Sequence, residues 1–329
     1  MMLPFTENMS VWERIYNAFY IDLVNTWFDY TIRVEEQKVV EEALGYSLPP
    51  LTEIAKNTSV LLVNAHHSWN GVKVIPPSVV EVGGIHLHNK TAQRLPESLK
   101  KWVDESDGVV VFSFGSLIRG STLPQNRLNA ILKAFGRFKQ RFVCKWEDDT
   151  ISLPDNVMTM KWVPQYDLLR HPKCVGFITH GGMLSMTEAV AAGVPVLAVP
   201  VMGDQPGNAA HAQRAGFAEI LHLDDINEDT MYNALQKVLS PELRARAKAV
   251  SNIWWDRPVS PMDAAVFYVE KTAKYNGLNL SSHSRWISAT QLIIFEVLGV
   301  VFFFTFILLL VGFCICRCTK SNHDKIKQN

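Results

Sequence analysis

The chain has 329 residues, of which 48% are hydrophobic and 19% are charged, and its 32 basic and 32 acidic side chains cancel. This length is that of two ordinary domains, and the apolar content is that of a globular protein with an additional apolar segment. Because no basic stripe crosses the part of the chain before that segment, nucleic acid is not expected as a partner. The five cysteines show neither a disulfide framework nor metal-ligand spacing, so no metal is predicted.

The N-terminal third combines helical patterning with two short strands. Residues 9–44 are patterned as a helix rich in aromatic side chains, and a break follows at Ser47-Leu48-Pro49-Pro50. Strands are predicted at 59–64 and 79–82. Pro96 and the polar run near 100–108 then predict a linker over 89–108, so that residues 1–88 form a separate region.

From residue 109 onward, apolar runs alternate with helical segments. This alternation predicts an α/β domain of the doubly wound, Rossmann-like type over 109–280. A last helix is expected at 261–276. The predicted strands are 109–114, 141–146, 157–161, 175–179, 195–199 and 217–221, and the predicted helices are 124–138, 183–192, one from 208, and further helical segments to about 239.

The most informative turn joins the strand at 175–179 to the helix at 183–192. It reads His180-Gly181-Gly182, and the two glycines allow a ligand to approach the backbone closely. A helix that begins here offers unpaired N–H groups and the positive end of its dipole. The turn therefore predicts a diphosphate site, to which His180 adds a donor.

Other polar residues lie at spacings that suit a sugar nucleotide. Glu188 is six residues beyond Gly182, about 9 Å along the helix at 1.5 Å per residue, where the hydroxyls of a sugar attached to the diphosphate would reach it. Asp204 and Gln205, on the turn after the strand at 195–199, offer a carboxylate and an amide to a second polyol. Upstream, Trp162 and Gln165 offer a flat face and an amide to a base.

The stretch 162–208 resembles the signature of the UDP-glycosyltransferases, the family that includes the membrane-bound UDP-glucuronosyltransferases. The resemblance extends through 112–116 upstream and 256–258 downstream, and covers most of residues 60–329. It implies the GT-B fold, in which two Rossmann-like domains face each other across a cleft. By this resemblance the C-terminal domain is complete, and residues 1–88 are the remnant of the N-terminal, acceptor-binding domain.

The resemblance also assigns roles to the residues of the donor site. No cofactor is implied, because the UDP-sugar is a co-substrate. Many members carry Asn at the position of Leu184, and here Ser185 is expected to take over part of that polar contact. The implied donor contacts are Ser116, His180, Gly181 and Gly182 to the phosphates, Trp162 and Gln165 to uridine, Glu188 to ribose, and Asp204 with Gln205 to the transferred sugar.

The implied reaction is transfer of a hexose or glucuronic acid to a small lipophilic hydroxyl compound with inversion. The general base is expected in the N-terminal lobe, of which this chain carries only the last part, so we expect a fragment that binds UDP and transfers sugar poorly. The alternative is a non-catalytic, membrane-tethered donor-binding subunit or a regulatory fragment. Such a subunit would associate with related transferases as a homo-oligomer or hetero-oligomer.

The C-terminal region predicts a membrane anchor. Residues 292–313 are almost entirely apolar, long enough at helical rise to span a bilayer core of about 30 Å. The basic tail 314–329 is predicted to be cytosolic, and the main domain lumenal in the endoplasmic reticulum. Asn-x-Ser/Thr triplets at Asn8, Asn57, Asn89 and Asn279 agree with that location. A tail anchor that leaves the domain cytosolic is the alternative.

Overall fold

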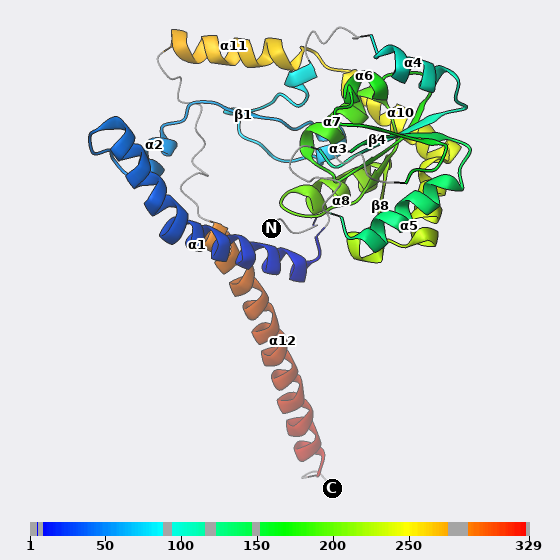
Figure 1. Ribbon diagram of the computed structural model, residues 1–329. Coiled ribbons are helices and arrows are strands. Elements are labelled where there is room, and N and C mark those ends of the chain that lie inside the picture. Colours follow the sequence, from blue (N-terminus) through cyan, green and yellow to red (C-terminus); the bar gives the residue numbers. More distant parts are fainter. Residues whose placement is uncertain are drawn as a thin grey trace. The chain divides into compact units, whose positions relative to one another are not determined.

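The structure is a computed structural model, and it describes residues 5, 9–87, 94–115, 123–146, 152–275 and 289–326 (Figure 1). Contacts divide the chain into two compact units. One comprises the described residues of Met1–Asn8 and Thr58–Leu280, and the other comprises those of Met9–Asn57 and Ser281–Asn329.

A parallel sheet of six strands forms the centre of the first unit. The strand order is β5-β4-β3-β6-β7-β8, so the chain starts in the middle, moves to one edge, and then returns to β6 and moves to the other edge. This confirms the predicted doubly wound α/β architecture. The strands are β3 (Val109–Ser113), β4 (Arg141–Lys145), β5 (Val157–Met160), β6 (Cys174–Thr179), β7 (Val196–Ala198) and β8 (Ala218–Ile220).

Alternating side chains of the strands form a hydrophobic core on each face of this sheet. On β3, Val109 and Val111 belong to one core and Val110 and Phe112 to the other, as the two-residue period of a strand requires. The helices of the first unit flank the sheet (Figure 1). The first core takes side chains from α4 (Glu97–Asp104), α6 (Gln165–Leu169), α7 (Met183–Ala192), α8 (Gln205–Ala215) and α10 (Pro241–Trp255), and the second from α5 (Gln125–Gly136) and α9 (Glu228–Val238).

The remaining elements of this unit are those of its N-terminal part, its last helix and one 3-10 turn between β8 and α9. Trp69 of α3 is buried and packs edge to face on Phe217, with ring centroids 6.0 Å apart. Helix α3 also contacts α8 and α10, so this part of the chain packs directly on helices of the large sheet. The elements are β1 (Leu61–Val63), α3 (His67–Asn70), β2 (Val79–Glu81), which pairs parallel to β1, the 3-10 turns η1 (Ile85–Leu87) and η3 (Leu223–Asp225), and α11 (Pro261–Lys274).

Several helices differ from the sequence prediction, among them α8, α4 and α10. Helix α8 begins at Gln205 instead of residue 208, because Pro206 is favourable in a first helical turn. Helix α4 lies within the segment predicted as a linker, since its buried side chains Leu99 and Val103 fall on one helical face. Helix α10 was not predicted. It starts at Ser240, whose hydroxyl accepts a hydrogen bond from the N–H of Leu243.

The second unit consists of the helices α1 (Val11–Leu44), α2 (Leu51–Lys56) and α12 (Ala289–Ile326). Ser10 and Glu13 form a capping box at the start of α1, and Gly45 ends the helix with φ 75°. Helix α12 covers the predicted transmembrane segment 292–313. Across the described part of the chain, however, no helix has the combined length and apolar character that a membrane crossing requires, and the predicted span is not supported.

Candidate functional site

The candidate site lies where the topology of the sheet reverses, at the carboxyl ends of the neighbouring strands β3 and β6. In doubly wound sheets, the loops that leave two such strands diverge and leave a crevice that binds ligands. The loop after β3 contains Gly115, and the loop after β6 is His180-Gly181-Gly182. Ser116, a predicted phosphate contact in the loop after β3, lies outside the described residues.

His180 is buried between two glycines that come from different strands. A Cβ atom at Gly115 would lie 2.8 Å from the imidazole Cε1, and a Cβ atom at Gly182 would lie 2.6 Å from Nε2. Both distances are shorter than side chains tolerate, so only glycine lets the two loops close around the ring. Gly182, which the sequence suggested as a point of ligand approach, therefore also positions His180, together with Gly115.

The start of α7 presents backbone donors at this point. Gly181 has φ +84°, a conformation that favours glycine, and it turns the chain from β6 into the helix. Gly182 is the N-cap, and no side chain caps the helix there. The first N–H groups of α7 therefore have no partner within the helix, which together with the helix dipole makes this position suitable for an anion.

Gln165 connects α6 to α7 through side-chain hydrogen bonds. Its amide Nε2 donates to the carboxylate of Glu188 over 2.7 Å and to the hydroxyl of Ser185 over 3.2 Å. These three predicted residues thus form one polar group along α7. The bond from Gln165 orients the Glu188 carboxylate.

Trp162 is 72% exposed, and its ring is therefore available to a ligand. The ammonium of Lys145 lies 5.9 Å from the ring centroid and donates a hydrogen bond to the carbonyl oxygen of Gly115 over 2.7 Å. Lys145 was not among the predicted residues. The signal that could have indicated it is its place one residue before the end of the predicted strand 141–146, at the carboxyl end of the parallel sheet.

Asp204 and Gln205 lie at the start of α8. The amide oxygen of Gln205 accepts hydrogen bonds from the N–H groups of Val201 and Met202, at 2.8 and 2.9 Å. That oxygen therefore holds the loop between β7 and α8.

Asn208 links this loop to the glycine turn, and sequence reasoning missed it. Its Nδ2 donates to the carbonyl oxygen of Gly181 over 3.0 Å and to the carboxylate of Asp204 over 2.7 Å. The spacing of four residues between Asp204 and Asn208 on one helix face was the available signal.

Burial lowers the pKa of His180, and the attraction of Asp204 opposes this shift only in part. The imidazole is therefore neutral at neutral pH and has one N–H to donate. Its Nδ1 lies 3.3 Å from the hydroxyl of Thr179. In the described residues, no group of three or more His, Cys, Asp or Glu side chains could hold a metal ion.

The doubly wound parallel sheet, with a glycine turn at its reversal point, is GT-B-like, and two solved structures share this fold. The glycosyltransferase of kitacinnamycin is 21% identical with TM-score 0.53, covering 64% of this chain and 54% of that one. Spinosyn forosaminyltransferase is 24% identical with TM-score 0.51, covering 63% and 53%.

All 329 residues match the sequence model of the family described as UDP-glucoronosyl and UDP-glucosyl transferase, and the chain belongs to this family. It is similar to UDP-glucosyltransferase 2 of Dactylopius coccus, with 31% identity over 99% of this chain and 65% of that protein. It is also similar to human UDP-glucuronosyltransferase 2B7, with 33% identity over 96% and 59%. The chain thus spans about half to two thirds of the length of these relatives.

Proposed function

We propose that this chain carries the donor site of a UDP-glycosyltransferase and binds the UDP part of a UDP-sugar at the carboxyl ends of β3 and β6. The observation that carries the proposal is the arrangement along α7. The helix starts with free N–H groups at Gly182, and six residues later it presents Glu188 with a carboxylate oriented by Gln165. Gly182 and Glu188 are separated by about 9 Å along the axis of α7. This separation suits the distance from the diphosphate of UDP to the hydroxyls of the attached ribose.

The remaining groups fit the other parts of the donor. The exposed ring of Trp162 offers a stacking surface to uracil, while the ammonium of Lys145 lies beside it. Asp204 faces the glycine turn through Asn208, where the carboxylate can accept hydrogen bonds from hydroxyls of the transferred sugar.

The proposed contribution to catalysis is stabilisation of the leaving diphosphate. An acceptor hydroxyl attacks the anomeric carbon, the bond from that carbon to the phosphate oxygen breaks with inversion, and UDP leaves with increased negative charge. The N–H groups at the start of α7 and the donor of neutral His180 face that charge. Since the pKa of His180 is lowered by burial, it is suited to donating a hydrogen bond rather than to serving as a cation.

The acceptor is proposed to be a small lipophilic hydroxyl compound, as the family resemblance of the sequence implies. We propose that the general base is not supplied by the residues of the donor site. The 329-residue chain is therefore expected to bind UDP and to transfer sugar slowly or not at all.

The test is titration of the purified chain with UDP by isothermal calorimetry, with UMP and uridine as comparison ligands. We expect UDP to bind most tightly, and His180→Ala to lower its affinity sharply. Binding of UDP with equal affinity by His180→Ala would remove His180 from the site, and failure of the folded protein to bind UDP would refute the donor-site proposal. Robust glycoside formation from UDP-glucose or UDP-glucuronic acid would refute only the proposal of poor transfer.

We also propose that the folded part of the chain resides in the endoplasmic reticulum lumen. Asn57, which begins one of the Asn-x-Ser/Thr triplets, is exposed at the end of α2. Expression in cells should give a glycosidase-sensitive mobility shift that Asn57→Gln reduces. A chain without glycan would contradict this location.

A further inference from the structure

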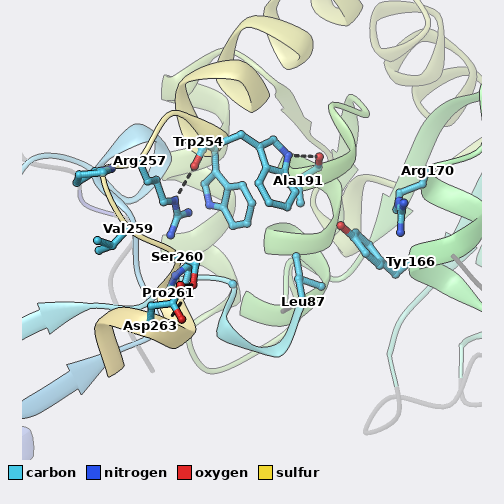
Figure 2. Close-up of a pocket in the computed structure, with 13 residues that line it drawn as sticks. Leu87, Tyr166, Arg170, Ala191, Trp254, Arg257, Val259, Ser260, Pro261 and Asp263 are labelled. Carbon is cyan, nitrogen blue, oxygen red and sulfur yellow. Dashed lines mark hydrogen bonds between the residues drawn. The ribbon is translucent and has the colours of Figure 1, made fainter. Parts of the chain in front are cut away.

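The helix α7, whose start forms the proposed phosphate site, is held in place at its other end by α10. The indole N–H of Trp255 donates to the carbonyl oxygen of Ala191 over 2.8 Å (Figure 2). The hydroxyl of Ser251 donates to the same oxygen over 3.3 Å. Both donors belong to α10, so two hydrogen bonds attach the last turn of α7 to that helix.

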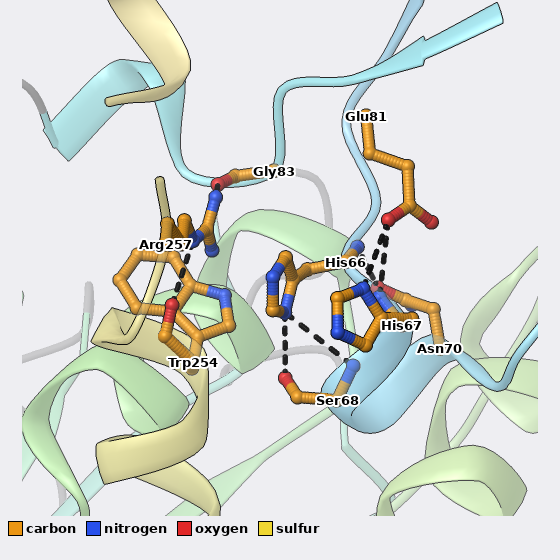
Figure 3. A network of polar contacts seen from close by, with 8 residues as sticks. All are labelled: His66, His67, Ser68, Asn70, Glu81, Gly83, Trp254 and Arg257. Atoms are coloured by element: carbon orange, nitrogen blue, oxygen red, sulfur yellow. Dashed lines mark hydrogen bonds and ion pairs between the residues drawn. The ribbon is translucent and has the colours of Figure 1, made fainter. Parts of the chain in front are cut away.

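The start of α7 is held by two asparagines from other segments. Asn208 of α8 donates to the carbonyl oxygen of Gly181 over 3.0 Å. Asn70, at the end of α3, directs its Nδ2 to the Sδ atom of Met183, the first residue of α7, over 3.9 Å. The amide oxygen of Asn70 accepts a hydrogen bond from the N–H of His66 over 2.9 Å (Figure 3). The backbone donors at the start of α7 are therefore held in a fixed position.

The groups that this fixed site offers to an anion are neutral. The first N–H groups of α7 carry only the partial charge of the helix dipole. Burial lowers the pKa of His180, so its imidazole is uncharged at neutral pH, and the nearby carboxylate of Asp204 attracts that imidazole. Since a diphosphate carries several negative charges, a cation close to the phosphates would add to the affinity that the neutral donors supply.

The order of the strands places Lys145 where such a cation is needed. The strands β5, β4, β3 and β6 are neighbours in that order and end at one edge of the sheet. Trp162 follows β5, Lys145 ends β4, Gly115 follows β3 and His180 follows β6. At about 4.8 Å between neighbouring strands, β5 and β6 are about 14 Å apart. A nucleoside diphosphate that extends from Trp162 to the glycine turn passes the end of β4.

Two contacts fix the ammonium of Lys145 between the base platform and the glycine turn. The ammonium lies 5.9 Å from the centroid of the Trp162 ring. It also donates to the carbonyl oxygen of Gly115 over 2.7 Å, so it is directed from β4 towards β3. Gly115 in turn touches His180, because a Cβ atom there would lie 2.8 Å from the imidazole Cε1. With the base on Trp162, the phosphate nearest to Lys145 is the one attached to the ribose, the α-phosphate.

We propose that Lys145 is a cation of the donor site, and that its ammonium balances the negative charge of the α-phosphate of the bound nucleotide. This inference rests on the proposed donor site and adds a residue that the sequence did not indicate. Lys145 is half-buried, and opposite charges attract each other more strongly at such a position than in water. The same charge stabilises UDP as it leaves with increased negative charge.

The test compares uridine, UMP and UDP, which carry no phosphate, one phosphate and two phosphates. Each is titrated by isothermal calorimetry into the full chain and into Lys145→Met, which keeps an apolar stem and removes the charge. We expect the variant to bind UMP and UDP about tenfold more weakly and uridine less than about twofold more weakly, because only the nucleotides have an α-phosphate. Lys145→Arg, which keeps the charge, should bind UDP within about threefold of the wild type.

Salt gives a second readout, which a purely structural role of Lys145 would not change. Raising NaCl from about 0.1 to about 1 M shortens the Debye length from about 10 to about 3 Å and screens the ammonium. The affinity of the wild type for UDP should therefore fall more steeply with salt than that of Lys145→Met. Lys133→Met, at an exposed position in the last turn of α5, is the matched control and should behave as wild type.

Three results would each overturn the proposal. They are an equal loss of affinity for uridine and UDP in Lys145→Met, an unchanged affinity of that variant for UMP or UDP, and the same salt dependence in variant and wild type. As long as the wild-type chain binds UDP, these results concern Lys145 and leave the donor site in place. A folded wild-type chain that bound no UDP would refute the donor site, and the role of Lys145 with it.

Discussion

The contact between Glu188 and the ribose gives the sharpest prediction, because the expected loss depends on two hydroxyl groups that can be removed from the ligand. The Glu188 carboxylate is already oriented by the amide of Gln165 over 2.7 Å. A ribose can therefore donate its two hydroxyls to an acceptor whose position is fixed. Glu188→Ala removes that acceptor and leaves the start of α7 unchanged.

The magnitude follows from the chemistry of the bonds. Each hydrogen bond to a charged group contributes about 1.5–3 kcal/mol, and two bonds to one carboxylate are not fully additive. We expect Glu188→Ala to weaken UDP binding by about 2–3 kcal/mol, which is roughly 30-fold to 150-fold.

The assay is a cycle of calorimetric titrations with UDP and 2′,3′-dideoxy-UDP, in the wild-type chain and in Glu188→Ala. The wild-type chain should lose affinity for the dideoxy compound by about the same factor as the variant loses for UDP, and the variant should bind both ligands equally. Glu270→Ala, an exposed carboxylate on α11, serves as the control and should behave as wild type. If Glu188→Ala still preferred UDP over the dideoxy compound, the proposed ribose contact would be wrong.

Three further predictions concern the glycine turn and a buried histidine. Gly182→Ala should destabilise the fold by about 1–3 kcal/mol and weaken UDP binding, because its Cβ would lie 2.6 Å from Nε2 of His180. Asn208→Ala should cost about 1–3 kcal/mol in unfolding free energy by removing the donor to the carbonyl oxygen of Gly181. His66 has a pKa lowered from 6.5 to about 3 by burial, so the folded state excludes a proton that the unfolded state binds. The stabilising contribution of neutral His66 to the free energy of unfolding is complete above pH 6.5. It is lost as the pH falls towards 3, by up to about 1.4 kcal/mol per pH unit. His66→Asn should remove this pH dependence.

Urea unfolding measures all three stability effects, and for His66 the comparison is the difference between wild type and variant across pH 3–7. Wild-type stability and UDP affinity in Gly182→Ala would show that the turn can move away from His180. An unchanged unfolding free energy in Asn208→Ala would mean that another group satisfies Gly181. Parallel pH profiles for the wild type and His66→Asn would contradict the lowered pKa.

Much of the sheet was predictable because strands such as β3 and β6 are short, continuous apolar runs bounded by glycine or polar residues. Helix α7 was predicted with its observed bounds, since Gly182 and Gly193 mark its two ends. Helix α4 was not predicted. Its sequence is polar overall, and only packing against the sheet shows that Leu99 and Val103 form a buried face.

For the candidate site too, some features follow from local sequence and others only from packing. Local sequence predicted His180, Gly181 and Gly182 as site residues, because a strand, a glycine turn and a helix follow one another directly in the chain. The bond between Gln165 and Glu188 joins two helices, and the bond from Lys145 to Gly115 joins the ends of two strands. The sequence listed the first pair as separate residues and did not indicate the second.

By itself, then, the sequence determined the order of strands and helices, the glycine turn and the family resemblance, because each depends on residues close together in the chain. Only the tertiary structure decided that Gly115 and Gly182 enclose His180, that Asn208 holds the glycine turn, and that the guanidinium of Arg257 lies over the ring of Trp254. The physical reason is that hydrogen bonds and steric contacts between distant segments arise only when the sheet brings those segments together, and no local pattern of residue types specifies such a meeting.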